Sequence, residues 1–157
     1  MKIIFVVIGK TNTAYLEEGT SVYTKRIKRY LGFELLVLPD VKNTKNFKPA
    51  ILKEKEGEKI LRACENSDWM VLLDEKGKEF TSVQFANDLE KLMVRGLKTV
   101  HFVVGGAYGF SPQVYEKAHQ KLALSKMTYS HQLIRLIFVE QLYRAFSILK
   151  NEPYHNV

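Results

Sequence analysis

The segment from Thr99 to Thr128 holds the residues that best fit a ligand-binding function. Val100 to Val104 is an apolar run of the kind found in buried strands, and it ends in the sequence Gly105-Gly106-Ala107-Tyr108-Gly109. Glycines at the end of a strand permit a sharp turn and let a ligand lie against the main chain. A second apolar run, Leu122 to Leu124, ends in Ser125-Lys126-Met127-Thr128. Because open α/β sheets bind ligands outside the carboxyl ends of their strands, the two loops predict one site.

The glycine loop does not match a known phosphate-binding pattern. Ala107 and Phe110 break the G-x-G-x-x-G register, and no acidic residue follows Gly105 at the distance expected for a ribose ligand. The composition of the loop by itself therefore slightly favours a tight strand-to-helix turn without a ligand. The string Gly106-Ala107-Tyr108-Gly109 also matches the G-x-x-G loop of a KH domain, but its middle residues carry no positive charge to meet a phosphate.

The polar side chains that could move a proton lie near the end of the chain. His131 and Arg135 are four residues apart and share one face of a predicted helix, as do Glu140 and Arg144. A Glu-Arg pair at this spacing is most often a local salt bridge, so we expect Glu140 to position Arg144. We interpret His101, in a strand, and His119, on a short helix, as structural. The polar tail that follows the helix contains Tyr154 and His155.

Hydrophobic periodicity predicts strands that alternate with helices, which is typical of an α/β protein with a mainly parallel sheet and helices on both faces. The third strand is expected to stop at Asp74, with Gly77 marking the turn that follows. The expected strands cover residues 3–8, 33–38, 69–73, 100–104 and 122–124, and the expected helices cover 15–30, 49–64, 81–94, 111–120 and 132–149.

The last predicted helix is apolar around nearly its whole circumference. Such a helix has to be buried on most sides. One arrangement places one face on the sheet and the other on a second subunit, and the alternative is a central helix within the monomer. The apolar pattern alone leaves both arrangements open.

Length and charge limit the classes of protein to consider. The chain has 157 residues, so residues 1–157 are expected to form a single domain. Its formal net charge of +7 suits a polyanionic partner such as nucleic acid, although a merely basic protein would have the same surplus.

The single cysteine, Cys64, excludes an internal disulfide and a cysteine-based zinc cluster, and it fits a reducing cytoplasm. No apolar segment without charges is long enough to span a membrane.

Three ordered segments make the chain resemble the ribosomal RNA large subunit methyltransferase H family, which belongs to the SPOUT class. They are the loop VVGGAYG, the loop LSKMT and the C-terminal sequence HQLIRLIFVEQLYRAFSILKNEPYH, and MKIIFVVIGK, KEKEGEKIL and LDEKGKEFTS match as well. The resemblance covers nearly the whole chain. It implies a C-terminal trefoil knot, a homodimer and S-adenosyl-L-methionine as cofactor. It also implies methylation of N3 of a pseudouridine in 23S ribosomal RNA, with the RNA in an assembled ribosome and without a metal.

The resemblance also implies which residues form the site. Its cofactor contacts fall on Leu73, Gly105, Leu124, Ser125, Lys126, Met127, Thr128 and Tyr129, with Gly106 adjoining them. Leu73 and Met127 could equally be core residues. Methyl transfer from a sulfonium mainly needs alignment of the reacting atoms in a dry site, but an imide nitrogen must also lose its proton. The candidates for handling that proton or the base are His131, Arg144, Tyr154 and His155.

Two other functions compete with this one. A basic α/β module that binds RNA without catalysis would need no cofactor, and the chain has no clustered aromatic residues of the RNP type. A nucleotide- or flavin-binding protein would want a phosphate loop early in the chain, where Ile8-Gly9-Lys10-Thr11 has one glycine. Binding of S-adenosylmethionine separates the methyltransferase from both.

Overall fold

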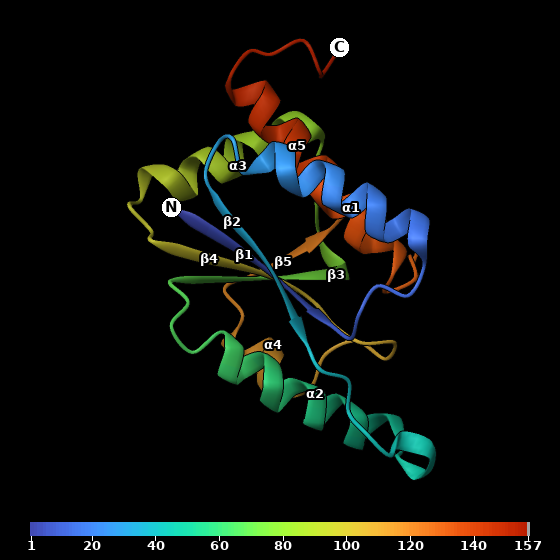
Figure 1. Ribbon diagram of the computed structural model, residues 1–157. Helices are drawn as coiled ribbons and strands as arrows, with labels where there is room; N and C mark the ends of the chain where they lie inside the picture. Colours follow the sequence, from blue (N-terminus) through green and yellow to red (C-terminus); the bar gives the residue numbers. More distant parts are fainter. Residues whose placement is uncertain (157) are drawn as a thin grey trace.

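A five-stranded parallel sheet forms the centre of the molecule in the computed structural model, which describes residues 1–156 (Figure 1). The strand order is β2-β1-β4-β3-β5, and every neighbouring pair is parallel. The strands are β1 (Lys2–Ile8), β2 (Gly32–Leu38), β3 (Trp69–Glu79), β4 (Thr99–Val104) and β5 (Gln120–Ala123). This arrangement confirms the α/β class with a parallel sheet.

Helices cover both faces of the sheet (Figure 1). One face carries α1 (Ala14–Ile27), α3 (Ser82–Val94) and α5 (Leu133–Leu149), and the other carries α2 (Pro49–Ala63) and α4 (Pro112–Lys117), with a short 3-10 turn at Thr44–Asn46. Strand β1 shows why its sequence is apolar throughout: Phe5 and Val7 pack toward one layer of helices, whereas Val6 and Ile8 pack toward the other. A strand buried on both sides needs apolar residues at every position.

Local signals in the sequence fix several helix ends. The Thr81 hydroxyl accepts a hydrogen bond from the N–H of Gln84, and the Gln84 side chain accepts one from the N–H of Thr81, as the predicted capping box requires. Gly96 has a φ of +73°, which suits its place after the end of α3. The Ser111 hydroxyl caps α4, but this helix ends at Lys117, so His119 lies beyond it rather than on it.

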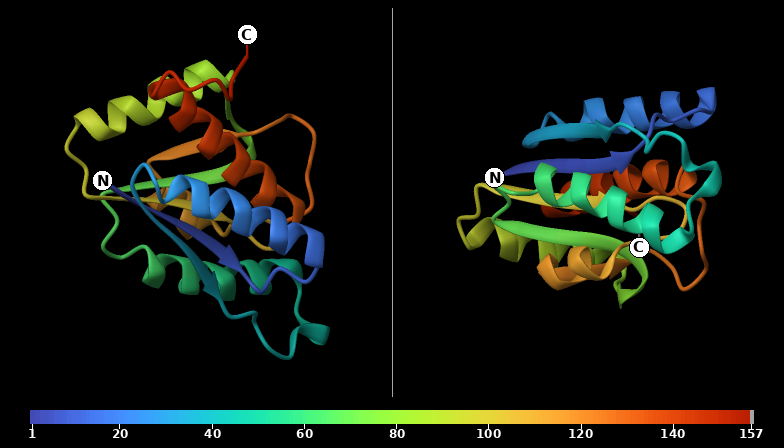
Figure 2. Two further views of the ribbon diagram at one scale, coloured as in Figure 1. Left: turned by 45° about the horizontal axis from the view of Figure 1, so that its top comes forward. Right: turned by 90° about the horizontal axis from the view of Figure 1, so that it is seen from below.

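Helix α5 lies over the sheet between α1 and α3 (Figure 2). Its Phe138 ring packs on Phe5 and Phe102, with ring centroids 4.6 and 4.9 Å apart. The neighbouring helices therefore account for much of its apolar circumference within one chain, as the central-helix alternative expected. The homodimer stays a prediction, and so does the trefoil knot.

Strand β3 corrects the prediction that the third strand stops at Asp74. It continues to Glu79, and its pairing with β5 shifts register between Leu73 and Lys78. A Cβ on Gly77 would lie 2.6 Å from the backbone carbon of Lys121. Gly77 is thus required by the close approach of two strands and not by a turn.

Both histidines predicted to be structural make internal contacts. The buried imidazole of His101 bonds to the Ser67 hydroxyl at 2.8 Å. His119 accepts a hydrogen bond from the N–H of Met70 at 3.0 Å and stacks on Trp69. These contacts confirm the structural interpretation of both residues.

Candidate active site

A cavity of about 600 Å³ opens at the carboxyl ends of β4 and β5, beside the middle of β3. This volume lies within the range of roughly 300–1,000 Å³ typical of small-molecule and cofactor sites. The glycine loop after β4 and the loop after β5 form much of its wall, so the structure brings together the two loops that the sequence singled out. Its lining residues are Leu73, Asp74, Glu75, Lys76, Val104, Gly105, Gly106, Ala107, Tyr108, Gly109, Phe110, Tyr115, Leu124, Ser125, Met127, Thr128, Tyr129, Ser130, His131 and Ile134.

The predicted cofactor residues lie in this wall with one exception. The lining residues among them are Leu73, Gly105, Gly106, Leu124, Ser125, Met127, Thr128 and Tyr129. Lys126 does not line the cavity. Its side chain is 86% exposed, and its ammonium lies 3.7 Å from a Glu79 carboxylate oxygen. Lys126 therefore points away from the ligand space formed by its neighbours in the sequence.

The glycine loop is a tight turn that presents main chain to the cavity. The N–H of Gly109 donates to the carbonyl of Gly106 at 3.1 Å, and Gly109 has a φ of +80°. A Cβ on Gly105 would lie 3.0 Å from the carbonyl oxygen of Gly109. A side chain at Gly105 would therefore press on the turn, which would have to shift by a few tenths of an ångström to accept it.

Two carboxylates in the middle of β3 accept hydrogen bonds from other parts of the cavity wall. The Tyr115 hydroxyl donates to Asp74, which also accepts from the N–H of Lys76 at 2.8 Å. The Thr128 hydroxyl donates to Glu75. Burial and the bond to Asp74 raise the pKa of Tyr115, which keeps its hydroxyl protonated as a donor. Neither carboxylate was among the site residues predicted from the sequence, although Asp74 directly follows a buried apolar run.

The loop after β5 is anchored before it enters α5. The Ser125 hydroxyl accepts from the N–H of Met127 at 2.9 Å, and the Ser130 hydroxyl accepts from the N–H of Leu133 at 3.1 Å. The Gln132 amide bonds to the carbonyl of Lys10 and to the N–H of Asn12, both at 3.1 Å. These bonds hold the loop beside the segment that follows β1.

His131 lies in the cavity wall, and its backbone carbonyl accepts a hydrogen bond from Arg135. The Arg135 guanidinium is 1% exposed and donates to three carbonyls: His131 at 3.0 Å, Gly9 at 2.8 Å and Ile8 at 2.6 Å. Burial and the positive charge of Arg135 lower the pKa of His131, against the opposing charge of Asp40. The imidazole is therefore neutral at neutral pH and able to accept a proton.

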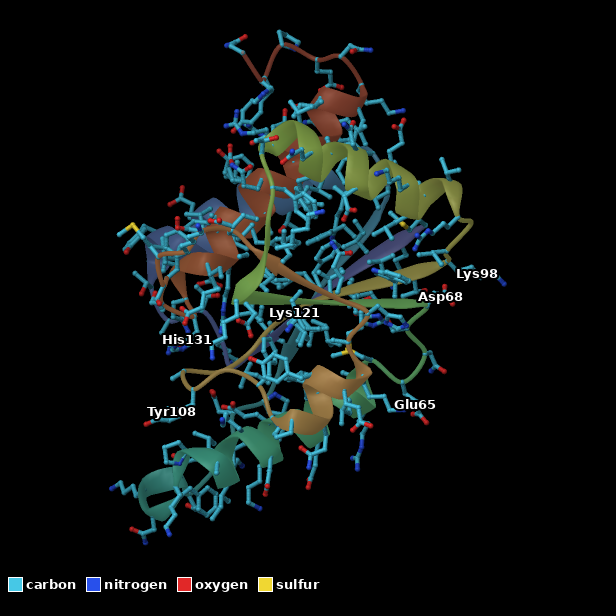
Figure 3. The ribbon with its side chains drawn as sticks, turned by 180° about the vertical axis from the view of Figure 1, so that it is seen from behind. Glu65, Asp68, Lys98, Tyr108, Lys121 and His131 are labelled. Carbon is cyan, nitrogen blue, oxygen red and sulfur yellow. The ribbon has the colours of Figure 1, made fainter. Side chains whose placement is uncertain are left out.

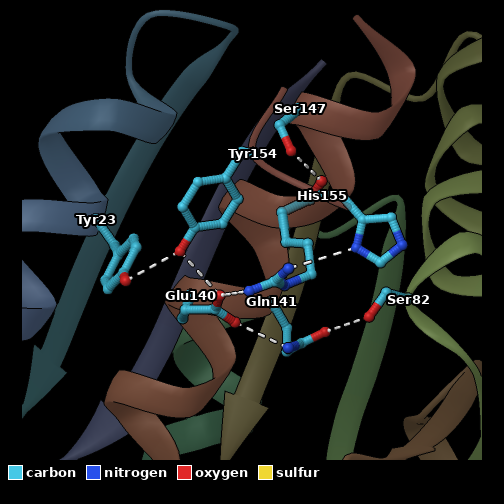
Figure 4. A network of polar contacts seen from close by, with 8 residues as sticks. Tyr23, Ser82, Glu140, Gln141, Ser147, Tyr154 and His155 are labelled. Carbon is cyan, nitrogen blue, oxygen red and sulfur yellow. Dashed lines mark hydrogen bonds and ion pairs between the residues drawn. The ribbon is translucent and has the colours of Figure 1, made fainter. Parts of the chain in front are cut away.

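The other candidate catalytic residues lie at the far end of α5 (Figure 4). Arg144 forms an ion pair with Glu140 at 2.5 Å, which supports the predicted positioning role of Glu140. Glu140 also accepts from the Tyr154 hydroxyl at 3.0 Å, and Arg144 donates to Nδ1 of His155 at 3.4 Å. Burial and hydrogen bonds with Tyr23 and Glu140 raise the pKa of Tyr154.

Within one chain this polar cluster is far from the cavity. Arg144 lies eleven residues beyond Leu133, which is roughly 16 Å along the helix axis. None of Arg144, Tyr154 and His155 lines the cavity. One chain therefore brings His131 to the glycine loop and leaves the other three candidates apart from it.

The described residues, 1–156, offer no group of three or more His, Cys, Asp or Glu side chains that could hold a metal ion. None of the helices in that range is both long and apolar enough to cross a membrane.

Comparison with solved structures shows a shared fold, and a family model defines the class of protein. The fold is similar to the structure of a probable methylase family protein from Haemophilus influenzae, with a TM-score of 0.55 at 11% identity, covering 99% of this chain and 70% of that one. It is also similar to a probable methyltransferase from Bordetella pertussis, with a TM-score of 0.55 at 12% identity, covering 92% of this chain and 95% of that one. A family model described as "Predicted SPOUT methyltransferase" matches residues 1–155.

Curated relatives narrow this class to a family. Proteins called "Ribosomal RNA large subunit methyltransferase H" are 58% identical in Parabacteroides distasonis and 53% identical in Christiangramia forsetii, each over 99% of this chain and 99% of the relative. The relative of the same name in Flavobacterium johnsoniae is 51% identical over the same shares. The chain belongs to the ribosomal RNA large subunit methyltransferase H family of SPOUT methyltransferases.

Proposed function

We propose that this protein transfers a methyl group from S-adenosyl-L-methionine to N3 of a pseudouridine in 23S ribosomal RNA. We further propose that it works in the cytoplasm, as a homodimer, on an assembled ribosome. The observation that supports the proposal most directly is the cavity at the ends of β4 and β5 and beside the middle of β3, whose wall contains eight of the nine residues expected to contact the cofactor.

The residues of the cavity suit S-adenosylmethionine chemically. The main chain at Gly105 and Gly106 lies open to the cavity and offers polar backbone groups to adenine and ribose. Leu73, Leu124 and Ile134 supply apolar surface, and Asp74 and Glu75 supply negative charge for a cation. When bound, the cofactor provides an activated methyl group, and these residues would hold it and keep water away.

We propose that a neutral His131 takes the proton from N3. It lies in the same wall as the glycine loop, and its lowered pKa favours the unprotonated imidazole. Arg144, Tyr154 and His155 could reach a cavity only in another subunit, because α5 carries them away from the cavity of their own chain. We therefore propose that the tail of one subunit completes the cavity of its partner.

Calorimetry with S-adenosylmethionine tests the cofactor. We expect Gly105→Ala to weaken binding by roughly tenfold or more, because the new Cβ displaces the turn that presents the main chain. Lys126→Ala is the matched control from the same predicted set and should bind normally, because its side chain lies outside the wall. Absence of binding by the wild type would support a non-catalytic RNA-binding module instead.

Methylation of ribosomes from a strain lacking the gene, followed by mass spectrometry of 23S RNA, tests the substrate. Modification at another atom or in another RNA would contradict the pseudouridine assignment. Light scattering should report about twice the 18.2 kDa of one chain; an active monomer would exclude a site shared between subunits.

Subunit mixing tests the shared site. Deleting residues 154–157 should leave cofactor binding intact and lower turnover by roughly a hundredfold or more. Mixing this variant with Gly105→Ala should restore activity, because a mixed dimer contains one intact cavity completed by one intact tail. If the mixture is no more active than its components, the tail does not act on the partner's cavity.

A further inference from the structure

Tyr108 occupies the tip of the turn at the mouth of the cavity. The bridge between Gly106 and Gly109 closes this turn, so that Ala107 and Tyr108 are its two outermost residues. Figure 3 shows Tyr108 and His131 at the same edge of the molecule, opposite the edge that carries Asp68 and Lys98. The side chain of Tyr108 is thus held by a constrained backbone next to the proposed reaction site.

The ring of Tyr108 is available for a ligand. It is 56% exposed and lines the cavity. Among the described residues it has no aromatic neighbour, and its hydroxyl has no hydrogen-bond partner. Tyr115, another tyrosine in the wall, has partners for both its hydroxyl and its ring. The hydroxyl bonds to Asp74, the ring packs on Phe110, and the Lys121 ammonium lies 5.7 Å from the ring centre.

Two lysines lie at the same opening. Lys76 lines the cavity, and the Lys121 ammonium lies against the ring of Tyr115 in the cavity wall. Asp74 and Glu75 are in the wall as well, but both accept hydrogen bonds from neighbouring side chains. An exposed aromatic ring among lysines is the combination with which proteins hold an unpaired nucleotide, the ring for the base and the ammonium groups for the backbone.

We propose that Tyr108 is a stacking platform for a nucleobase of the substrate RNA at the mouth of the cavity. This inference rests on the proposed function and adds to it the residue that holds the unstacked base. It also gives a role to the Gly106–Gly109 string. A KH loop presents positive charge to a phosphate, whereas this turn presents an aromatic face to a base.

Three substitutions at Tyr108 distinguish stacking from other contributions. Tyr108→Ala removes the ring, Tyr108→Leu keeps apolar surface without a π face, and Tyr108→Phe removes only the hydroxyl. We expect Tyr108→Ala to raise the KM for ribosomes by roughly 5- to 150-fold, the range for loss of one stacked base. Tyr108→Phe should stay near the wild type, and Tyr108→Leu should fall between them. The matched control is Tyr15→Ala, since Tyr15 is a 67% exposed tyrosine on α1 outside the cavity wall.

Two binding measurements separate the platform from the cofactor site. Calorimetry should give all Tyr108 variants the wild-type affinity for S-adenosylmethionine. Filter binding of protein-free large-subunit ribosomal RNA should show the same order of variants as the KM, and this readout does not depend on methyl transfer.

The outcomes also separate this inference from the proposed function. Unchanged KM and RNA affinity in Tyr108→Ala, with normal methylation, would overturn the platform alone. A loss of cofactor affinity equal to the loss for RNA would make Tyr108 a cofactor contact and overturn it too, as would an equal effect of Tyr15→Ala. If the wild type neither binds S-adenosylmethionine nor methylates ribosomes, the proposed function fails, and RNA affinity still decides whether Tyr108 stacks on a base.

Discussion

Replacing Arg135 by leucine should destabilise the protein and disturb the cavity wall at the same time. Arg135 is among the largest fully buried side chains, and its guanidinium joins the first turn of α5 to the end of β1. Its partners are three carbonyls and the Thr11 hydroxyl, the last at 3.2 Å. Carbonyl and hydroxyl oxygens therefore surround its positive charge.

The size of the effect follows from what the leucine leaves behind. Removing the donors leaves the buried carbonyls of Ile8 and Gly9 without this partner, at roughly 1–3 kcal/mol each. The cost of burying a guanidinium disappears as well, and this offsets part of the loss. We expect a net decrease of roughly 2–4 kcal/mol in the free energy of unfolding, because this offset removes part of the cost of the two unpaired carbonyls. The free energy of unfolding of Arg135→Lys should lie between those of the wild type and of Arg135→Leu, because one ammonium cannot reproduce the guanidinium geometry.

Urea unfolding followed by the fluorescence of Trp69, the single tryptophan, measures this change. Protein concentration has to be the same for all variants, because a dimer's stability depends on it. The control is Arg29→Leu, which removes an exposed arginine on the surface after α1 and should change stability by less than about 0.5 kcal/mol.

A second readout distinguishes the local effect from general destabilisation. The charge of Arg135 contributes to the lowered pKa of His131, so NMR titration of Arg135→Leu should show the His131 pKa moving up toward the ordinary value. Wild-type stability together with an unchanged His131 pKa would refute the role assigned to Arg135.

Three further perturbations test other contacts. Thr81→Ala removes the capping box of α3 and should cost about 1 kcal/mol in urea unfolding; an unchanged midpoint would contradict the capping role. Glu56→Gln should raise the melting temperature at pH 7 but not at pH 4, because burial raises the pKa of this buried carboxyl and its ionisation lowers stability as pH rises. A gain of the same size at both pH values would exclude this linkage. The wild type should lose stability as pH falls below about 6.5, because unfolded His131 binds a proton that the folded form resists. Thermal melts of His131→Gln should show a smaller loss, and an identical pH dependence would assign the effect to other groups.

Much of the site could be predicted from the sequence because its signals are local. A strand that ends in glycines, an apolar run that ends in small polar residues, and a capping box are written in consecutive residues, and each keeps its meaning wherever the segment lies. In a parallel sheet the carboxyl ends of the strands meet at one edge, so the convergence of the glycine loop and the segment from Leu124 to Tyr129 also followed from the order of elements.

The tertiary structure alone decided the features that depend on contacts between distant segments. Asp74 and Glu75 lie in the wall, at the point where the pairing of β3 with β5 changes register. No periodicity in the sequence predicts this change of register. Arg135 has the same spacing from His131 as any surface pair, and only the packing of α5 against the end of β1 encloses it.

The direction of α5 was decisive for the remaining candidates. The sequence by itself identified Arg144, Tyr154 and His155 as polar groups near His131 in the chain. A helix separates residues that are near in sequence, because each residue advances the chain by about 1.5 Å along the axis. The tail accordingly lies at the opposite end of α5 from the cavity in its own chain. Spacing along a sequence defines which side chains share a helix face, whereas the path of the folded backbone defines which of them share a site.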